Sequence, residues 1–188
     1  IKKLPFELTA DQQKALREVV ADLDQPQPMS RLLQGDVGSG KTIIALLAAK
    51  IVLESGQQAA IAAPTTVLAT QHLKTAKQLG LFKDHELALL LSSTPPEEKK
   101  ELETRLKKGQ PTLVFGTHAL WVKTSIFKKL GLAIVDEQHR FGVKQRAELL
   151  KKNRLGCHLL SMSATPIPRT LALVMFGDLA ISNIKELP

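Results

Sequence analysis

The chain has 188 residues, 44% of them hydrophobic and 23% charged, which is ordinary for one globular domain with a buried core. Its net charge of +8 suits a polyanionic partner, although a solvated lysine-rich surface is the commoner explanation of such an excess alone. The single Cys157 excludes an internal disulfide, and no apolar run reaches membrane-spanning length. We therefore expect a cytoplasmic protein without membrane association.

Helical and strand patterns alternate along the chain. Apolar residues recur at helical spacing from Ala10 to Leu23, and Thr9 precedes them. Short apolar runs predict strands at Arg31–Leu33, Ala59–Ala63, Glu86–Leu91, Thr112–Phe115, Leu132–Val135 and His158–Met162. Further helices are predicted from the glycine-rich segment to Ser55, over Val67–Leu79, after Thr94 (the expected N-cap) with Pro95 at its first position, over Val143–Lys152, and from Pro168 to near Gly177.

Each predicted strand is a continuous apolar run, which favours an α/β fold with a parallel sheet covered by helices on both faces. In such sheets, ligands bind at the carboxyl ends of the strands. Polar residues follow strand after strand at that edge, so we expect the functional site there.

A glycine-rich segment joins the first predicted strand to the next helix: Gly35-Asp36-Val37-Gly38-Ser39-Gly40-Lys41-Thr42. It matches the P-loop pattern G-x-x-x-x-G-K-[ST] with the strand and helix flanks that a P-loop requires. The glycines let backbone N–H groups point inward around an anion. Lys41 adds a cation for the β- and γ-phosphates, and the Thr42 hydroxyl is placed to ligate Mg²⁺. We predict a nucleoside triphosphate site; the alternative is an ordinary glycine turn.

The strand Leu132–Val135 runs directly into Asp136-Glu137-Gln138-His139, as in a Walker B strand. Asp136 can hold Mg²⁺ opposite Thr42, directly or through water. Glu137 points differently in an extended tip, so it can orient and deprotonate water. We predict Lys41, Asp136 and Glu137 as catalytic residues. Gln138 and His139 can sense the γ-phosphate, or they belong to a solvated loop.

Thr9 and Gln12 allow two interpretations. T-x-x-Q is a capping box, a local device at a helix start. The same residues match a Q-motif, in which the Gln12 amide would read the adenine edge because it donates and accepts at once. Phe6 would then cover the adenine ring. Both roles can coexist.

Hydroxyls, amides and turn backbone at other strand ends suit contacts with DNA phosphates. The predicted DNA-contacting residues are Pro64, Thr65, Gln71, His72, Gly116, Thr117 and His118. A role as helix N-cap is a strong alternative for Thr65 and for Thr66. Aromatic residues make up only 4% of the chain, which favours backbone tracking over base stacking.

Together these motifs resemble the first half of a superfamily 2 helicase motor, with Ser163-Ala164-Thr165 as its motif III. A narrower resemblance, over the whole chain, is to the RecG family of bacterial branched-DNA helicases. It rests on Asp136 to Val143 (DEQHRFGV), Ala164 to Leu171 (ATPIPRTL) and Gly177-Asp178-Leu179. The transcription-repair coupling factor is the near relative, in which Glu is expected in place of Gln138.

This resemblance implies one RecA-like ATP-binding domain over residues 1–188, from a monomeric ATP- and Mg²⁺-dependent DNA translocase of the bacterial cytoplasm and nucleoid. Such an enzyme would remodel stalled forks and Holliday junctions in DNA repair and recombination. By position, Gln12 would contact adenine. Ser163, Ala164 and Thr165 would couple the nucleotide state to domain movement.

The family also implies partners outside these residues. A complete motor needs a second RecA-like domain that supplies arginine fingers, and RecG helicases have an N-terminal wedge domain that splits the junction. We expect the chain to be a fragment of a longer protein, and the isolated fragment to bind nucleotide weakly and hydrolyse it negligibly. Two stretches depart from the family: Ser92-Ser93 stands where Thr-Gly is usual at a DNA backbone contact, and Trp121-Val122-Lys123 replaces a more aliphatic and polar stretch.

Two other functions remain as alternatives. A P-loop kinase would transfer phosphate to a small molecule, but the chain shows no Arg-rich lid, and its Asp-Glu pair favours water as the nucleophile. A non-hydrolysing nucleic-acid-binding module would use the P-loop only to gate affinity. Glu137→Gln separates these cases, since a hydrolase would lose turnover and a binding module would barely change.

Overall fold

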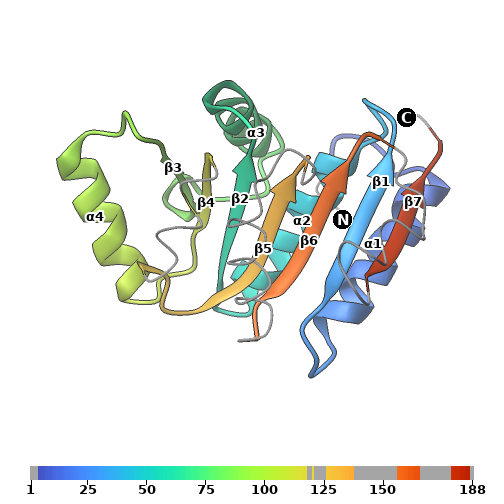
Figure 1. Ribbon diagram of the computed structural model, residues 1–188, viewed down its shortest axis with the longest axis horizontal. Helices are drawn as coiled ribbons and strands as arrows, with labels where there is room; N and C mark the ends of the chain where they lie inside the picture. Colours follow the sequence, from blue (N-terminus) through green and yellow to red (C-terminus); the bar gives the residue numbers. More distant parts are fainter. Residues whose placement is uncertain (1–3, 118–119, 121–125, 138–155, 166–178, 187–188) are drawn as a thin grey trace.

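The computed structural model describes residues 4–117, 120, 126–137, 156–165 and 179–186. They form a seven-stranded sheet in the order β3-β4-β2-β5-β6-β1-β7 (Figure 1). The strands are β1 (Ser30–Gly35), β2 (Gln58–Ala63), β3 (Leu87–Leu90), β4 (Leu113–Thr117), β5 (Leu130–Asp136), β6 (His158–Ser163) and β7 (Ala180–Ile184). The helices are α1 (Ala10–Leu23), α2 (Lys41–Glu54), α3 (Thr66–Gln78), α4 (Pro96–Lys107) and the 3-10 turn η1 (Asp84–Glu86).

Every pair of neighbouring strands is parallel. The central strand β2 is buried at each of its residues, as expected for a strand covered on both faces. All the carboxyl ends therefore meet at one edge of the sheet. The predicted α/β fold with a parallel sheet is confirmed.

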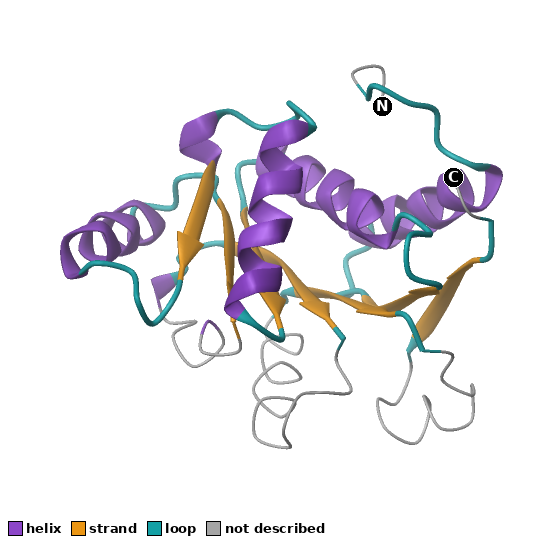
Figure 2. Ribbon diagram, turned by 90° about the horizontal axis from the view of Figure 1, so that it is seen from above, coloured by secondary structure: helices purple, strands orange, loops and turns teal. Residues whose placement is uncertain are grey.

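Hydrophobic side chains fill the space on both faces of the sheet. The larger cluster joins α1, α2 and α3 to one face, which all three helices cover in Figure 2. Its fully buried side chains include Leu33, Ile44, Ile61, Phe115 and Ile134. The smaller cluster packs the α4 residues Leu102 and Leu106 against Val114, Val135 and Leu159 of the opposite face. Because α2 is apolar nearly all round, it lies buried against the sheet, as its composition predicts.

A buried arginine fastens α1 to two strands. Arg31 of β1 donates from Nε to Asp22 at 2.7 Å and from Nη1 to Glu18 at 3.2 Å, both on α1. Its Nη1 also donates to the Ser182 hydroxyl of β7 at 2.7 Å. The network holds α1 against the β1–β7 end of the sheet.

The structure corrects the sequence prediction at one strand that it missed and at the N-cap of one helix. The edge strand β7 was not predicted, because Ser182 and Asn183 interrupt its short apolar pattern; only the pairing with β1 reveals it as a strand. Thr94 does not cap α4: the N-cap is Pro95, and the Thr94 hydroxyl accepts a hydrogen bond from the Leu91 N–H at 2.9 Å. The helices predicted over 143–152 and 168–177 lie outside the described residues.

Replacing the buried arginine tests how much its network stabilises the fold. Arg31→Met keeps an apolar stem but leaves Glu18 and Asp22 without their cation. These acidic side chains are about a third exposed and can recover water, so we expect the free energy of unfolding to fall by about 1–3 kcal/mol. Urea denaturation measures it. Arg17→Met, at an exposed position of α1, is the control and should change stability by no more than about 0.5 kcal/mol. Equal stability of the two variants would contradict a stabilising network.

Candidate functional site

The motifs singled out by the sequence converge on the carboxyl edge of the sheet. The glycine-rich segment follows β1, Asp136 ends β5, and Ser163 ends β6. Strand β6 lies between β1 and β5, so these three segments are neighbours in space (Figure 1). Pro64 and Thr117 lie at the ends of β2 and β4 along the same edge. The structure therefore brings these motifs together at the edge where the sequence predicts the site.

The loop after β1 requires glycine at specific positions. Gly38 and Gly40 have φ angles of 85° and 90°, a left-handed conformation that favours glycine. A Cβ on Gly40 would stand 2.3 Å from Gln12 Nε2, and one on Gly35 would stand 2.5 Å from the Ile184 carbonyl oxygen. The glycines thus provide the loop's curvature and also the space for α1 and β7 to approach it.

The N-terminus of α2 is suited to an anion. Its N-cap is Gly40, which gives no side-chain cap, and no acidic residue lies in the first turn. Unpaired N–H groups and the helix dipole make this end electropositive, and Lys41 adds a further positive charge. The Ser39 hydroxyl in the same loop is buried and is one of two such side-chain groups, among the described residues, without a hydrogen-bond partner. This donor set fits a phosphate group.

The Lys41 ammonium folds back over the loop. Its Nζ donates to the carbonyl oxygens of Gly35 at 2.6 Å and Asp36 at 2.8 Å. Burial lowers the pKa of Lys41, while the nearby carboxylates of Glu137, Asp136 and Asp36 act in the opposite direction. The ammonium is therefore half desolvated and close to the acidic strand tip of β5. A phosphate group would replace the lost hydration with a charge-assisted contact.

Gln12 connects α1 to the P-loop. Its Oε1 accepts from the Thr9 N–H at 3.0 Å and completes the capping box, while its Nε2 donates to the Ser39 carbonyl oxygen at 2.8 Å. The residue is buried, with 2% of its surface exposed. The predicted capping box is confirmed. The bond to the P-loop carbonyl was not predicted, because nothing local relates residues that are 27 positions apart.

Glu137 leaves the strand in an unusual conformation. Its φ of 52° makes it the one non-glycine residue with positive φ in the described part of the chain, which typically costs about 1–3 kcal/mol. Its N–H donates to the Met162 carbonyl oxygen at 2.9 Å. The extended tip expected from the sequence is therefore wrong: a left-handed turn directs Glu137 away from Asp136.

The Glu137 carboxylate connects the tip of β5 to motif III. Its Oε1 accepts from the Ala164 N–H at 2.9 Å, and its Oε2 accepts from the Ser163 hydroxyl at 3.4 Å. The Ser163 hydroxyl also lies 3.0 Å from the Thr165 hydroxyl, and Gln34 Nε2 donates to the Thr165 carbonyl oxygen at 3.3 Å. Motif III is thus a tight turn in direct contact with both neighbouring strands.

The residues predicted to contact DNA are not all at the surface. Thr65 is exposed and caps α3 by accepting from the Leu68 N–H at 3.2 Å, which confirms its N-cap interpretation; Thr66 is the first residue of that helix. Gln71 is exposed and Thr117 half-buried. Gly116 is buried, and a Cβ there would stand 2.7 Å from the Leu90 carbonyl oxygen. Its backbone is needed for strand packing.

His72, which the sequence groups with the predicted DNA contacts, is buried rather than at the surface. It is 9% exposed, and its Nε2 lies 2.9 Å from Asp136 Oδ2. The residues are 64 positions apart, so their contact arises only from the packing of α3. Its spacing on α3 with the buried Ala69 and Ala76 is the one sequence signal that it faces inward.

Several predicted residues lie outside the described part of the chain: His118, Gln138 and His139, together with the departing stretch 121–123. Within the described part, no group of three or more His, Cys, Asp or Glu could hold a metal ion by itself. A magnesium site built from one hydroxyl, one carboxylate, substrate oxygens and water does not need such a group. No helix there is long and apolar enough to span a membrane.

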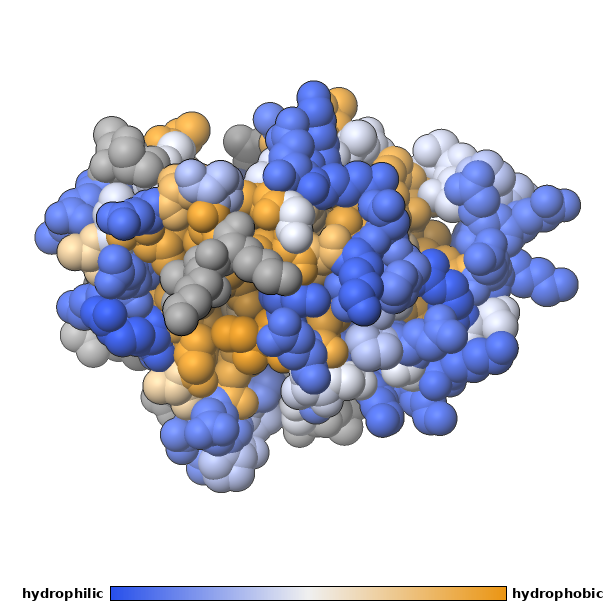
Figure 3. Space-filling view, turned by 180° about the vertical axis from the view of Figure 1, so that it is seen from behind, coloured by the Kyte–Doolittle hydropathy of each residue, from blue (hydrophilic) through white to orange (hydrophobic). Residues whose placement is uncertain are grey.

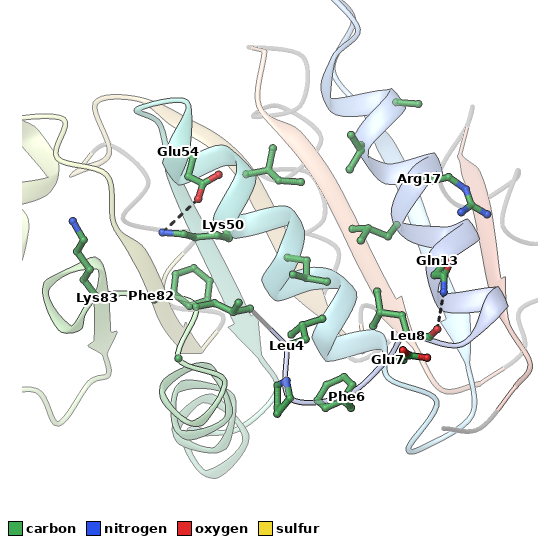
Figure 4. Close-up of a pocket in the computed structure, with 18 residues that line it drawn as sticks. Leu4, Phe6, Glu7, Leu8, Gln13, Arg17, Lys50, Glu54, Phe82 and Lys83 are labelled. Carbon is green, nitrogen blue, oxygen red and sulfur yellow. Dashed lines mark hydrogen bonds and ion pairs between the residues drawn. The ribbon is translucent and has the colours of Figure 1, made fainter. Parts of the chain in front are cut away.

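A large groove lies apart from this edge. It has a volume of about 1340 Å³ and is bounded by α1, α2, the segment 4–8 and the connection after α3. Hydrophobic surface is exposed over these elements in Figure 3, and Figure 4 shows Leu4, Phe6 and Phe82 lining the groove. No residue of the P-loop lines it. Phe6, predicted to cover adenine, is 44% exposed and contributes to this groove, whereas Gln12 does not.

A glycine loop, a carboxylate pair and the Ser163-Ala164-Thr165 turn at one edge of a parallel sheet define a P-loop nucleotide-binding domain with RecA-like architecture. A model of the DEAD/DEAH box helicase family matches residues 9–174, and the chain belongs to this family. The narrower resemblance is also confirmed. The chain is 52% identical to the ATP-dependent DNA helicase RecG of Aquifex aeolicus and 50% identical to that of a Synechocystis species, covering 100% and 98% of this chain.

Solved structures give the same result. A structure of RecG bound to a three-way DNA junction matches the whole chain with a TM-score of 0.82 at 43% identity. The UvsW helicase of bacteriophage T4 shares the fold, with a TM-score of 0.72 at 22% identity over 96% of this chain and 61% of that one. The chain spans 24% and 22% of the length of the two RecG relatives and 25% of the RecG structure.

The Gln12 bridge can be tested through stability and local exchange. Gln12→Met keeps the side-chain length but leaves the Thr9 N–H and the Ser39 carbonyl unpaired. We expect the free energy of unfolding to fall by about 1–3 kcal/mol and amide hydrogen exchange in residues 38–41 to accelerate. Lys14→Met, at an exposed position of the same helix, is the control. If the P-loop amides exchange equally in both variants, Gln12 does not restrain the loop.

Proposed function

We propose that this chain is the ATP-binding motor domain of a RecG-type DNA helicase that couples ATP hydrolysis to remodelling of branched DNA. The proposal rests on the family, on the relatives' names, and above all on one observation. The P-loop, the tip of β5 and the motif III turn follow three neighbouring strands, and Glu137 is hydrogen-bonded to motif III. Phosphate binding, hydrolysis and movement would therefore share one connected set of side chains.

In this proposal the P-loop binds the triphosphate. The N–H groups at the start of α2 and the Lys41 ammonium would contact the β- and γ-phosphates, in place of the loop carbonyls that Lys41 now meets. Thr42 and Asp136 would hold Mg²⁺, which supplies charge neutralisation of the phosphates when bound. Gln12 would contact adenine. Phe6 is still the proposed cover of the ring, although the structure places it in the groove that no P-loop residue lines. Because Gln12 is also hydrogen-bonded to Ser39, adenine binding would then affect the conformation of the P-loop.

Glu137 is the residue proposed to orient water. Its bonds to Ala164 and Ser163 hold the carboxylate at the tip of β6, beside the phosphate-binding loop. There it would align a water molecule with the γ-phosphate and accept its proton. A change in the charge or position of Glu137 would reach motif III directly, so Ser163, Ala164 and Thr165 would transmit the nucleotide state.

Pro64, Thr65, Gln71, Thr117 and His118 remain the proposed contacts to the DNA backbone. Pro64 and Thr65 follow β2, which lies next to the strand that carries Asp136. Thr117 ends β4, and Gln71 is exposed on α3. Hydroxyl, amide and backbone groups there would position DNA without reading its sequence. A second RecA-like domain would complete the site by supplying arginine fingers. The full protein is proposed to be a monomeric enzyme of the bacterial cytoplasm and nucleoid.

The hydrolytic role of Glu137 is tested in the natural full-length protein. Glu137→Gln keeps an oxygen that can accept from Ala164, so it should bind ATP within about threefold of wild type. Turnover on branched DNA should fall by about 100-fold or more, because the general base is lost. Lys41→Ala should lose nucleotide affinity itself. Glu98→Gln, at an exposed position of α4, is the control. Unchanged turnover in Glu137→Gln would show that Glu137 is not the general base, whereas ATP binding without turnover in the wild-type protein would favour the non-hydrolysing binding module.

A comparison of lengths tests the need for a second domain. Residues 1–188 alone should bind ATP weakly and hydrolyse it negligibly, with or without branched DNA, because no arginine finger reaches the γ-phosphate. A version extended through the second RecA-like domain should regain DNA-stimulated turnover, by about 1,000-fold or more if the finger acts as in other P-loop enzymes. Phosphate release by the short form at the rate of the extended form would overturn this part of the proposal.

A further inference from the structure

His72 occupies a position where an apolar residue would be expected. The buried side of α3 is formed by Ala69, His72 and Ala76, and the two alanines are fully buried. Placing an imidazole there costs free energy unless its polar atoms find a partner. The partner is Asp136, with Nε2 and Oδ2 2.9 Å apart and with side-chain exposures of 11% and 14%. The fold therefore brings a buried polar contact to the one aspartate that ends β5.

This contact leaves the carboxylate able to bind a cation. A carboxylate has two oxygens, and the His72 contact is to Oδ2, so Oδ1 can still face a metal ion or its water. Carboxylates that bind metals are commonly oriented by a hydrogen bond from a second residue, and loss of that bond typically weakens metal binding about 10–100-fold. His72 comes from a helix, which places its ring more rigidly than a loop would.

We infer that His72 is a positioning residue for the metal site: its Nε2–H fixes the rotamer of the Asp136 carboxylate that receives Mg²⁺ with the nucleotide. The inference rests on the proposed function in one respect, the assignment of Asp136 as a metal ligand. It also changes the role expected for His72, from a DNA contact to a support of the nucleotide site. Its neighbour Gln71 is exposed, so consecutive residues of α3 face the solvent and the metal site.

The test compares two variants of nearly equal shape in the full-length protein. The side-chain amide of His72→Gln can still donate a hydrogen bond to Asp136, whereas the thioether of His72→Met has no donor. Mn²⁺ serves as the probe, and electron paramagnetic resonance counts unbound Mn²⁺ in the presence of a non-hydrolysable ATP analogue. Asp136→Asn is the reference for a lost metal ligand. Lys77→Met, at an exposed position of α3, is the control for the substitution itself.

We expect His72→Met to weaken nucleotide-dependent Mn²⁺ binding by about tenfold or more, and His72→Gln to stay within about threefold of wild type. Affinity for the analogue without metal should be unchanged in both. Wild-type metal affinity in a folded His72→Met protein would overturn the inference and reduce His72 to packing. Equal weakening in both folded variants would overturn it too, because the donor would then not matter.

A separate readout covers the case in which the variants fold poorly. In the wild-type protein, the ¹⁵N resonance of His72 Nε2 should shift when Mg²⁺ is added with the analogue, and it should not shift in Asp136→Asn. No shift in wild type would count against the inference. If Asp136→Asn binds Mn²⁺ as wild type does, the assignment of Asp136 is wrong, and the proposed function needs another metal ligand. Loss of binding in Asp136→Asn alone would leave that function intact and reject only the role of His72.

Discussion

The parallel pairing of the strands is the constraint on which the whole site depends. Because every neighbouring pair runs in the same direction, the chain must return across the sheet after each strand, and every carboxyl end comes to the same edge. The order β5-β6-β1 then places the acidic tip of β5 and the motif III turn beside the glycine loop. Residues more than a hundred positions apart thereby become neighbours.

The start of α2 shows how the site is prepared for a charge that the protein itself does not supply. Most helices gain stability from a side-chain cap and from acidic residues in the first turn. This helix has a glycine N-cap and a lysine instead, and the Lys41 ammonium is partly desolvated between loop carbonyls and carboxylates. An anion at this position would accept hydrogen bonds from the free N–H groups of the helix and from the Lys41 ammonium. The unliganded helix end is therefore less stable than a capped one, and a bound anion would stabilise it.

Three hydrogen bonds at the tip of β5 hold its two acidic residues against different neighbours. Asp136 is held by His72 from α3, and Glu137 is held by Ala164 and Ser163 from the β6 turn. The left-handed backbone at Glu137 makes this division possible, because it turns the second carboxylate toward a different neighbour. Each carboxylate is therefore hydrogen-bonded to a different structural element: Asp136 to α3, and Glu137 to motif III.

The sequence by itself determined the fold class, the P-loop, the capping box at α1 and the family, because each depends on local spacing. These patterns can be recognised without knowing which segments meet in space: apolar runs of strand length, glycines at set intervals, and T-x-x-Q. The tertiary structure alone decided the edge strand β7, the Gln12 bond to Ser39 and the His72 contact with Asp136. In these cases a polar residue looks exposed or merely local in the sequence. Its partner is brought to it only by the packing of distant segments, and no local pattern encodes that distance.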